Sequence, residues 1–209
     1  MEWKQTGGGD FEQPEAGSYA AVCYRIIDLG TQHSEFQGES HDRHQCLISF
    51  ELDEKMADGR PFSVSKFYTV SLHEKSNLRK DMAGWRGRDF TEEELQGFDP
   101  KKILGKPCFL SIIRTDKGKS KIAGVSKLPK SMTPPAAVNP QVYFTMQAKT
   151  LDPVFEAFSD GIKKIIMQSP EYVALANRKQ PAPGGGTFNH MGEDIPFSNP
   201  YAGRMWQVV

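Results

Sequence analysis

Positively charged and aromatic side chains are interleaved in the middle of the chain. Residues 60–130 carry 16 basic and 8 acidic side chains, whereas residues 1–59 carry 4 basic and 12 acidic ones, although the 209 residues have no net charge. Cations can neutralise phosphates and exposed rings can stack on bases, and together they bind single-stranded nucleic acid without reading its sequence. The basic block therefore predicts a polyanion-binding surface. The alternative is that folding interleaves the charged segments and removes the patch.

Phe67 is the clearest candidate for stacking on a base. Its neighbours on the same face of an expected strand are Ser65, Thr69 and Ser71, so its ring is expected to point away from the core. Tyr24 lies among apolar residues, so a core position is the alternative for it. The residues expected to contact DNA are cations and the aromatic residues that lie between them in the sequence: Tyr24, Arg25, Lys66, Phe67, Tyr68, Arg79, Arg86, Arg88, Phe109, Arg114, Lys119 and Lys121.

Arg86 and Arg88 flank Gly87 just after an expected helix. We expect these two side chains to contact phosphates rather than to form buried ion pairs. Trp85 precedes them and is expected to close the helix against the sheet.

Motifs of known enzymes are weak in this sequence. Gly118-Lys119-Ser120 matches the end of a phosphate-binding loop, but Ile113 stands where the first glycine should be and a strand is expected to follow. The spacing of His41, His44 and Cys46 matches no four-ligand zinc site. We therefore expect a non-enzymatic protein that has no metal and no other cofactor.

Five strands and one helix account for the first 130 residues. Ser76 is the expected N-cap of the helix, and Thr91 with Glu94 forms a capping box behind it. The strands are expected from apolar alternation at 18–29, 44–53, 62–72, 107–114 and 121–125. A polar stretch, 30–43, is expected to be a mobile loop between the first two strands. A helix between the third and fourth of five strands is typical of the OB-fold, a partly open barrel.

The sequence predicts a mainly β fold, a five-stranded OB-fold-like barrel with helical additions. The barrel is expected to occupy residues 1–130. A proline-marked linker and C-terminal helices should follow at 131–179, with helix starts at Asp152-Pro153 and Ser169-Pro170. Residues 180–209 are expected to be a flexible tail, because they hold Gly184-Gly185-Gly186 and few core-forming residues.

Several spaced motifs resemble a family of phage-encoded OB-fold single-stranded DNA-binding proteins. The similarity covers about residues 15–175, and its motifs are Lys75–Arg79, Trp85–Thr91, Glu94-Leu95, Ile103–Cys108 and Ser169–Tyr172. The resemblance implies a non-catalytic protein that binds single-stranded DNA during phage replication, recombination or repair. An alternative stays open, a protein–protein interaction module that uses the same barrel and the C-terminal helix without nucleic acid.

The tail segment Glu193–Phe197 looks like the acidic tip of bacterial single-stranded DNA-binding proteins, which docks onto partner enzymes. The resemblance implies a partner-binding role for Asp194, Ile195, Pro196 and Phe197 toward replication or recombination proteins. The segment departs from that pattern because only two acidic residues precede Ile195 and 12 residues follow Phe197. Self-association into a homo-oligomer is left open.

The cellular location is expected to be cytoplasmic, in the bacterial host if the protein is phage-encoded. No apolar run is long enough for a membrane span, and the N-terminus is neither basic nor apolar. Three cysteines are an odd number in strand-like segments, which favours a reducing compartment over a disulfide framework.

Overall fold

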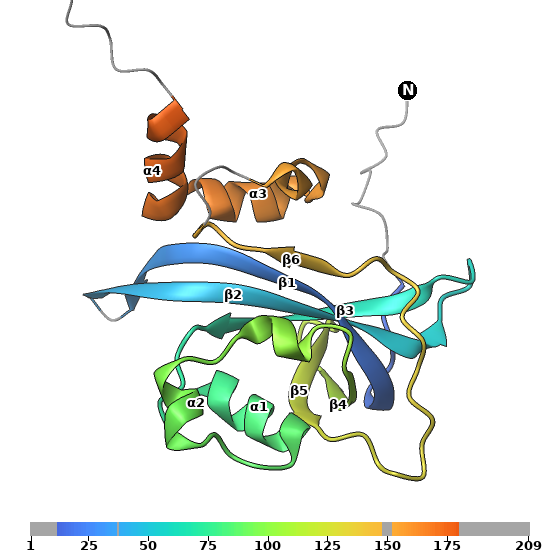
Figure 1. The fold of residues 1–209 in the computed structure, drawn as a ribbon. Helices are drawn as coiled ribbons and strands as arrows, with labels where there is room; N and C mark the ends of the chain where they lie inside the picture. Colours follow the sequence, from blue (N-terminus) through green and yellow to red (C-terminus); the bar gives the residue numbers. More distant parts are fainter. Residues whose placement is uncertain (1–11, 37, 148–151, 180–209) are drawn as a thin grey trace, which may run out of the picture. The chain divides into compact units, whose positions relative to one another are not determined.

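The computed structural model describes residues 12–36, 38–147 and 152–179, which form a mainly β structure with a few short helices (Figure 1). By its internal contacts the chain divides after Lys179, so all described residues belong to the first of two units. The strands are β1 (Gly17–Phe36), β2 (Glu39–Lys55), β3 (Pro61–Thr69), β4 (Pro107–Arg114), β5 (Ser120–Ser126) and β6 (Val142–Phe144). The helices are α1 (Asn77–Arg86), α2 (Glu92–Gln96), α3 (Asp160–Met167) and α4 (Pro170–Lys179), with short 3₁₀ turns η1 (Pro100–Ile103) and η2 (Pro153–Ala157).

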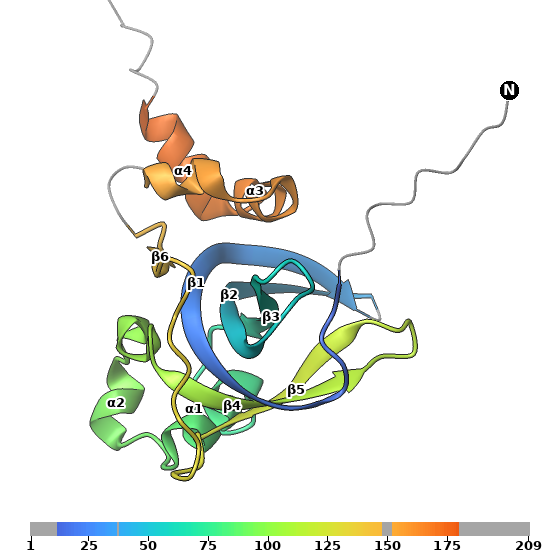
Figure 2. The same ribbon diagram turned by 90° about the vertical axis from the view of Figure 1, so that its right-hand side faces the viewer.

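The strands form one open sheet in the order β3-β2-β1-β4-β5, with β6 added beside β1. All neighbours are antiparallel except β6, which runs parallel to β1. The long strand β1 bends strongly (Figure 2), and its pairing with β2 shifts register twice, at Cys23/Arg25 and Asp28/Gly30. Such bulges bend a strand and increase its twist. Within the described residues β3 and β5 do not pair, so backbone hydrogen bonds leave the sheet open there.

The expectation that residues 30–43 form a mobile loop is wrong. β1 continues to Phe36 and β2 starts at Glu39, and the two strands pair from Thr31↔His44 to Phe36↔Glu39. The side chains of this ribbon are mostly exposed on both faces, so the sequence lacks the apolar alternation that marks a half-buried strand. Cross-strand backbone hydrogen bonds hold the ribbon instead.

The first apolar core lies between the inner face of the sheet and α1. Alternation over 44–53 places Cys46, Ile48, Phe50 and Leu52 on one face of β2. Of these, Ile48, Phe50 and Leu52 are buried in this core, and Cys46 packs against it half-buried. On α1, Met82 and Trp85 are buried as the helical spacing predicts. The Trp85 indole donates to the carbonyl oxygen of Pro107 at 2.7 Å, so this side chain closes the helix against β4.

The predicted helix caps are present. Ser76 accepts a hydrogen bond from the Arg79 amide at the start of α1, and Thr91 with Glu94 forms the reciprocal capping box of α2. Gly87 ends α1 with φ of 69°, a left-handed conformation that glycine adopts without strain.

Gly84 marks the closest approach of α1 to the sheet. A Cβ on this residue would lie 2.7 Å from the carbonyl oxygen of Val125. This oxygen belongs to the backbone of β5, so it cannot move aside as the end of a side chain could. We expect Gly84→Ala to lower the free energy of unfolding by about 1–3 kcal/mol through overpacking. Gly161→Ala is the matched control, because that α3 position is open and alanine favours a helix by about 1 kcal/mol. Urea unfolding of both variants checks the prediction, and a Gly84→Ala variant as stable as the natural protein would contradict it.

A second apolar core joins the C-terminal helices to β1, β2 and β6, which Figure 1 places on the side of the sheet away from α1. Its members include Ile27, Leu47, Phe144, Phe155 and Ile166. The amphipathic spacing of the C-terminal helix predicts packing on the barrel or on a second copy of the chain, and packing on the sheet is observed. The strand β6 was not predicted from the proline-marked linker. The helix start at Asp152-Pro153 is correct, but it opens a 3₁₀ turn, and α3 begins separately after Ser159.

Candidate nucleic-acid interface

Phe67 lies on the surface of β3, as its polar neighbours predict. Its side chain is 54% exposed. It lines a surface hollow of about 550 Å³ together with Ser65, Ile113 and Lys121. Ile113 is itself 46% exposed, so two exposed apolar side chains meet the cations Lys66 and Lys121 where β3 approaches β4 and β5. This arrangement offers a ring face and a positive charge to the same ligand.

The hairpin between β4 and β5 adds further cations next to this hollow. Arg114, Lys119 and Lys121 are exposed and form no ion pair with another described residue. Arg114 donates to the carbonyl oxygen of Gly118 at 2.9 Å, which holds its guanidinium over the turn. The sequence-predicted residues Lys66, Phe67, Arg114, Lys119 and Lys121 are therefore near neighbours.

The arginines of α1 and of the loop after it do not line the Phe67 hollow, and they already pair with carboxylates. Arg79 donates two hydrogen bonds to Asp89, which hold the pKa of that carboxyl at about 2. Arg88 and Arg86 both pair with Glu94, and the pKa of this carboxyl is held well below its usual value. The expectation that Arg86 contacts phosphate is corrected, because its side chain is only 14% exposed and its guanidinium lies over the rings of Phe90 and Phe98.

Lys66 and Tyr68 both contact the carboxylate of Asp81, a residue of α1. Lys66 Nζ lies 2.6 Å from Asp81 Oδ2, and the Tyr68 hydroxyl donates to the same oxygen at 2.8 Å. Tyr68 is 2% exposed, and burial raises the pKa of its hydroxyl. The expectation that Tyr68 meets DNA is corrected, because no base can reach a ring packed inside the core.

Three further predicted residues line the sheet with less exposure. Tyr24 is buried, and its hydroxyl shares a 2.7 Å hydrogen bond with Ser63, so the core position left open for it is the one observed. Arg25 is half-buried on the same strand, and Phe109 is half-buried on the neighbouring strand β4. Arg25 Nε donates to Ser49 at 3.2 Å. The predicted partner-binding residues Asp194, Ile195, Pro196 and Phe197 lie outside the described residues.

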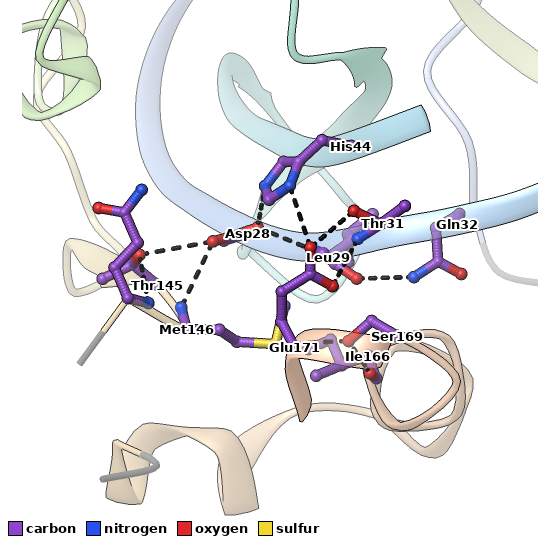
Figure 3. A network of polar contacts seen from close by, with 12 residues as sticks. Asp28, Leu29, Thr31, Gln32, His44, Thr145, Met146, Ile166, Ser169 and Glu171 are labelled. Atoms are coloured by element: carbon purple, nitrogen blue, oxygen red, sulfur yellow. Dashed lines mark hydrogen bonds and ion pairs between the residues drawn. The ribbon is translucent and has the colours of Figure 1, made fainter. Parts of the chain in front are cut away.

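A polar network that sequence reasoning missed joins β1 and β2 to α4 (Figure 3). His44 Nε2 lies 2.7 Å from Asp28 Oδ1, and its Nδ1 lies 3.5 Å from Glu171 Oε1. Glu171 accepts hydrogen bonds from the amide and the hydroxyl of Thr31 at 2.9 and 2.6 Å. Asp28 also accepts from the Met146 amide after β6. The network ties the C-terminal helices to the sheet, and its residues lie too far apart in the sequence for spacing to reveal it.

This network should make the attachment of α4 sensitive to acid. Burial opposes ionisation of Glu171, but the hydrogen bonds from Thr31 hold the pKa of its carboxyl below the ordinary value. Its stabilisation is therefore present above the pKa of an unfolded glutamate, about 4.3, and is lost as pH falls through the folded value. We expect Glu171→Gln to flatten the decline of melting temperature between about pH 6 and pH 3. Glu35→Gln, at an exposed carboxylate on β1, is the control, and equal profiles for the two variants would refute the assignment.

Three remaining features of the described part of the chain are its metal-ligating side chains, its thiols and its helices. No group of three or more histidine, cysteine or acidic side chains gathers there as a metal site requires. The three cysteines are free thiols, and burial raises the pKa of Cys23 and of Cys46 to about 12. Among the described helices none is long and apolar enough to cross a membrane.

Comparison with protein-family models and with curated proteins gave no match.

Proposed function

We propose that this protein binds single-stranded DNA without sequence specificity and without catalysis, in support of phage DNA replication, recombination or repair. The observation that carries the proposal is the Phe67 hollow, in which an exposed ring lies beside Lys121 and next to the basic β4–β5 hairpin. Base stacking on a ring and cations that follow the phosphates are the two parts of such a site.

The proposal includes an OB-type barrel that is open between β3 and β5. Its support is the strand order β3-β2-β1-β4-β5, in which β1 is shared by both halves, and the helix between β3 and β4. The hollow lies at this open seam, since its lining comes from β3, β4 and β5. Partly open barrels of this type bind oligonucleotides on their strands and loops.

Titration of labelled oligo-dT at two salt concentrations tests the proposal. We expect single strands to bind far more tightly than duplex, because a stacking ring needs an unpaired base. We also expect log K to fall with log salt by about 0.7 for each phosphate contacted. Equal affinity for duplex and single strand, or no dependence on salt, would refute the function.

A protein-binding role is the second candidate, and a specific cavity favours it. A pocket of about 690 Å³ lies between the sheet, α1, α2 and β6, and most of its lining is apolar, including Val70, Leu78, Leu95 and Phe98. Such a cavity suits an apolar side chain of a partner. If the pure protein binds no oligonucleotide at low salt, this candidate replaces the first.

A further inference from the structure

A second basic surface lies at the end of β4 and β5 that is remote from their hairpin. It is a groove of about 760 Å³ between the end of α1, the α2–η1 region and the segment that follows β5. Six cations line it: Arg86, Arg88, Lys102, Lys106, Lys127 and Lys130. Glu94 is the one carboxylate in the lining, and both arginines already pair with it. The groove therefore offers four lysines to an anion.

These four lysines are exposed and form no ion pair with another described residue. Four uncompensated charges around one hollow repel one another, and an anionic ligand relieves that repulsion. The aromatic rings of the groove are Trp85, which is 5% exposed, and Phe98, which faces Arg86. Since neither presents an open face, the groove suits phosphates better than it suits bases.

A surface strip without negative charge connects the groove to the Phe67 hollow. Neither β4 nor β5 contains an acidic residue. Their outward side chains alternate with the buried ones, and the outward set is Phe109, Ser111 and Ile113 on β4 with Lys121, Ala123 and Ser126 on β5. Lys106 and Lys127 flank the groove end of this strip, and Arg114 and Lys119 flank the hairpin end. Eight residues of β4 span about 25 Å, a length that several nucleotides of an extended strand can cover, and one OB-fold contacts about 4–16 nucleotides.

We propose that the groove is a second phosphate-binding site on the same DNA strand, which runs along the outward face of β4 and β5 from the hairpin to the groove. The inference rests on the proposed function and adds four residues to it: Lys102, Lys106, Lys127 and Lys130. Short oligonucleotides occupy the Phe67 hollow and the hairpin. Longer ones reach the groove as well and gain affinity there through charge alone.

The test compares two variants of equal charge change in the full chain. Lys127→Gln/Lys130→Gln removes two groove cations, and Lys55→Gln/Lys164→Gln removes two exposed lysines of β2 and α3. For oligo-dT of about 20 nucleotides, we expect the groove variant to lower the salt slope by about 1.4, since each phosphate contact on a single strand contributes about 0.7. For a dinucleotide, which is too short to reach from the Phe67 hollow along β4 to the groove, we expect no change. The control variant should match the natural protein at both lengths.

The outcomes separate the two proposals. If the natural protein binds no oligonucleotide, the proposed function and this inference fall together. If it binds but the groove variant equals the control at both lengths, or loses affinity equally at both, only the inference is overturned. A glutamate-rich peptide serves as the second probe. Its loss of binding in the groove variant, with binding of the long oligonucleotide unchanged, would assign the groove to an acidic protein partner and overturn the DNA path.

Discussion

Phe67→Ala is expected to weaken the binding of single-stranded DNA by about 5- to 150-fold while the protein stays folded. The range corresponds to about 1–3 kcal/mol, the contribution of one base stacked on an aromatic ring. The fold should survive because the ring is 54% exposed and its removal opens no cavity in the core. Fluorescence titration with oligo-dT gives the affinity, and thermal unfolding gives the stability of the same preparation.

Val173→Ala is the matched control for this prediction. Val173 is 48% exposed, but it lies on α4, away from the strands that line the Phe67 hollow. We expect its loss to change neither affinity nor melting temperature. If Phe67→Ala binds DNA as well as the control does, the hollow is not the stacking site. If it instead unfolds at a much lower temperature, the ring contributes to the core.

The strands and helix caps could be predicted because each depends on neighbours in the sequence. Alternation identified the buried face of β2, and Ser65 and Thr69 correctly placed Phe67 outside. Capping residues such as Ser76 and Thr91 act within one helical turn, so spacing alone locates them. The paired ribbon at 30–43 could not be predicted this way, since its polar side chains carry no alternation and its cross-strand hydrogen bonds are formed by the backbone.

The candidate site was only partly predictable, because charge alone does not say which cations are compensated. Arg79, Arg86 and Lys66 belong to the basic block by sequence, yet each meets a carboxylate from the same block once α1 and α2 fold. The cations Arg114, Lys119 and Lys121 of the β4–β5 hairpin form no ion pair with a described residue. The two strands contain no acidic residue, and Asp116 in the turn between them pairs with none of these cations. The alternative that folding compensates the basic block is therefore correct for Lys66 and for the arginines of α1 and the loop after it, and wrong for the hairpin and for the groove lysines.

The covering of the outer face of β2 also depends on contacts far apart in the chain. Leu47, Ser49 and Glu51 share this face by alternation, which would leave all three in solvent on a sheet with one core. The C-terminal helices cover Leu47, and the segment before β6 covers Glu51, which is 2% exposed. Its carboxylate accepts hydrogen bonds from the amides of Val138 and Asn139 and from the Asn139 side chain. A buried acid thus fastens the proline-marked segment to the sheet.

Glu51→Ala is therefore expected to lower the free energy of unfolding by about 2–4 kcal/mol. Hydrogen bonds to a charged group contribute about 1.5–3 kcal/mol, and the substitution also removes the acceptor of the part-buried hydrogen bonds from the Val138 and Asn139 amides. Glu54→Ala, at an exposed carboxylate of the same strand, should stay within about 0.5 kcal/mol of the natural protein. Urea unfolding gives the free energy of unfolding of both variants. Equal values would show that the hydrogen bonds of the Glu51 carboxylate do not stabilise the fold.

Hydrogen exchange distinguishes this fastening from a general loss of stability. If Glu51 holds the segment before β6, Glu51→Ala should raise exchange at the amides of Val138 and Asn139 far more than at Leu110 in the core of β4. Asn139→Ala removes one donor and keeps the carboxylate bound by two amides, so it should cost only about 1 kcal/mol. Equal acceleration at Val138 and Leu110 would mean that Glu51 supports the whole sheet. Selective acceleration would establish that a single buried carboxylate holds this segment across the outer face of β2, away from the strip on β4 and β5.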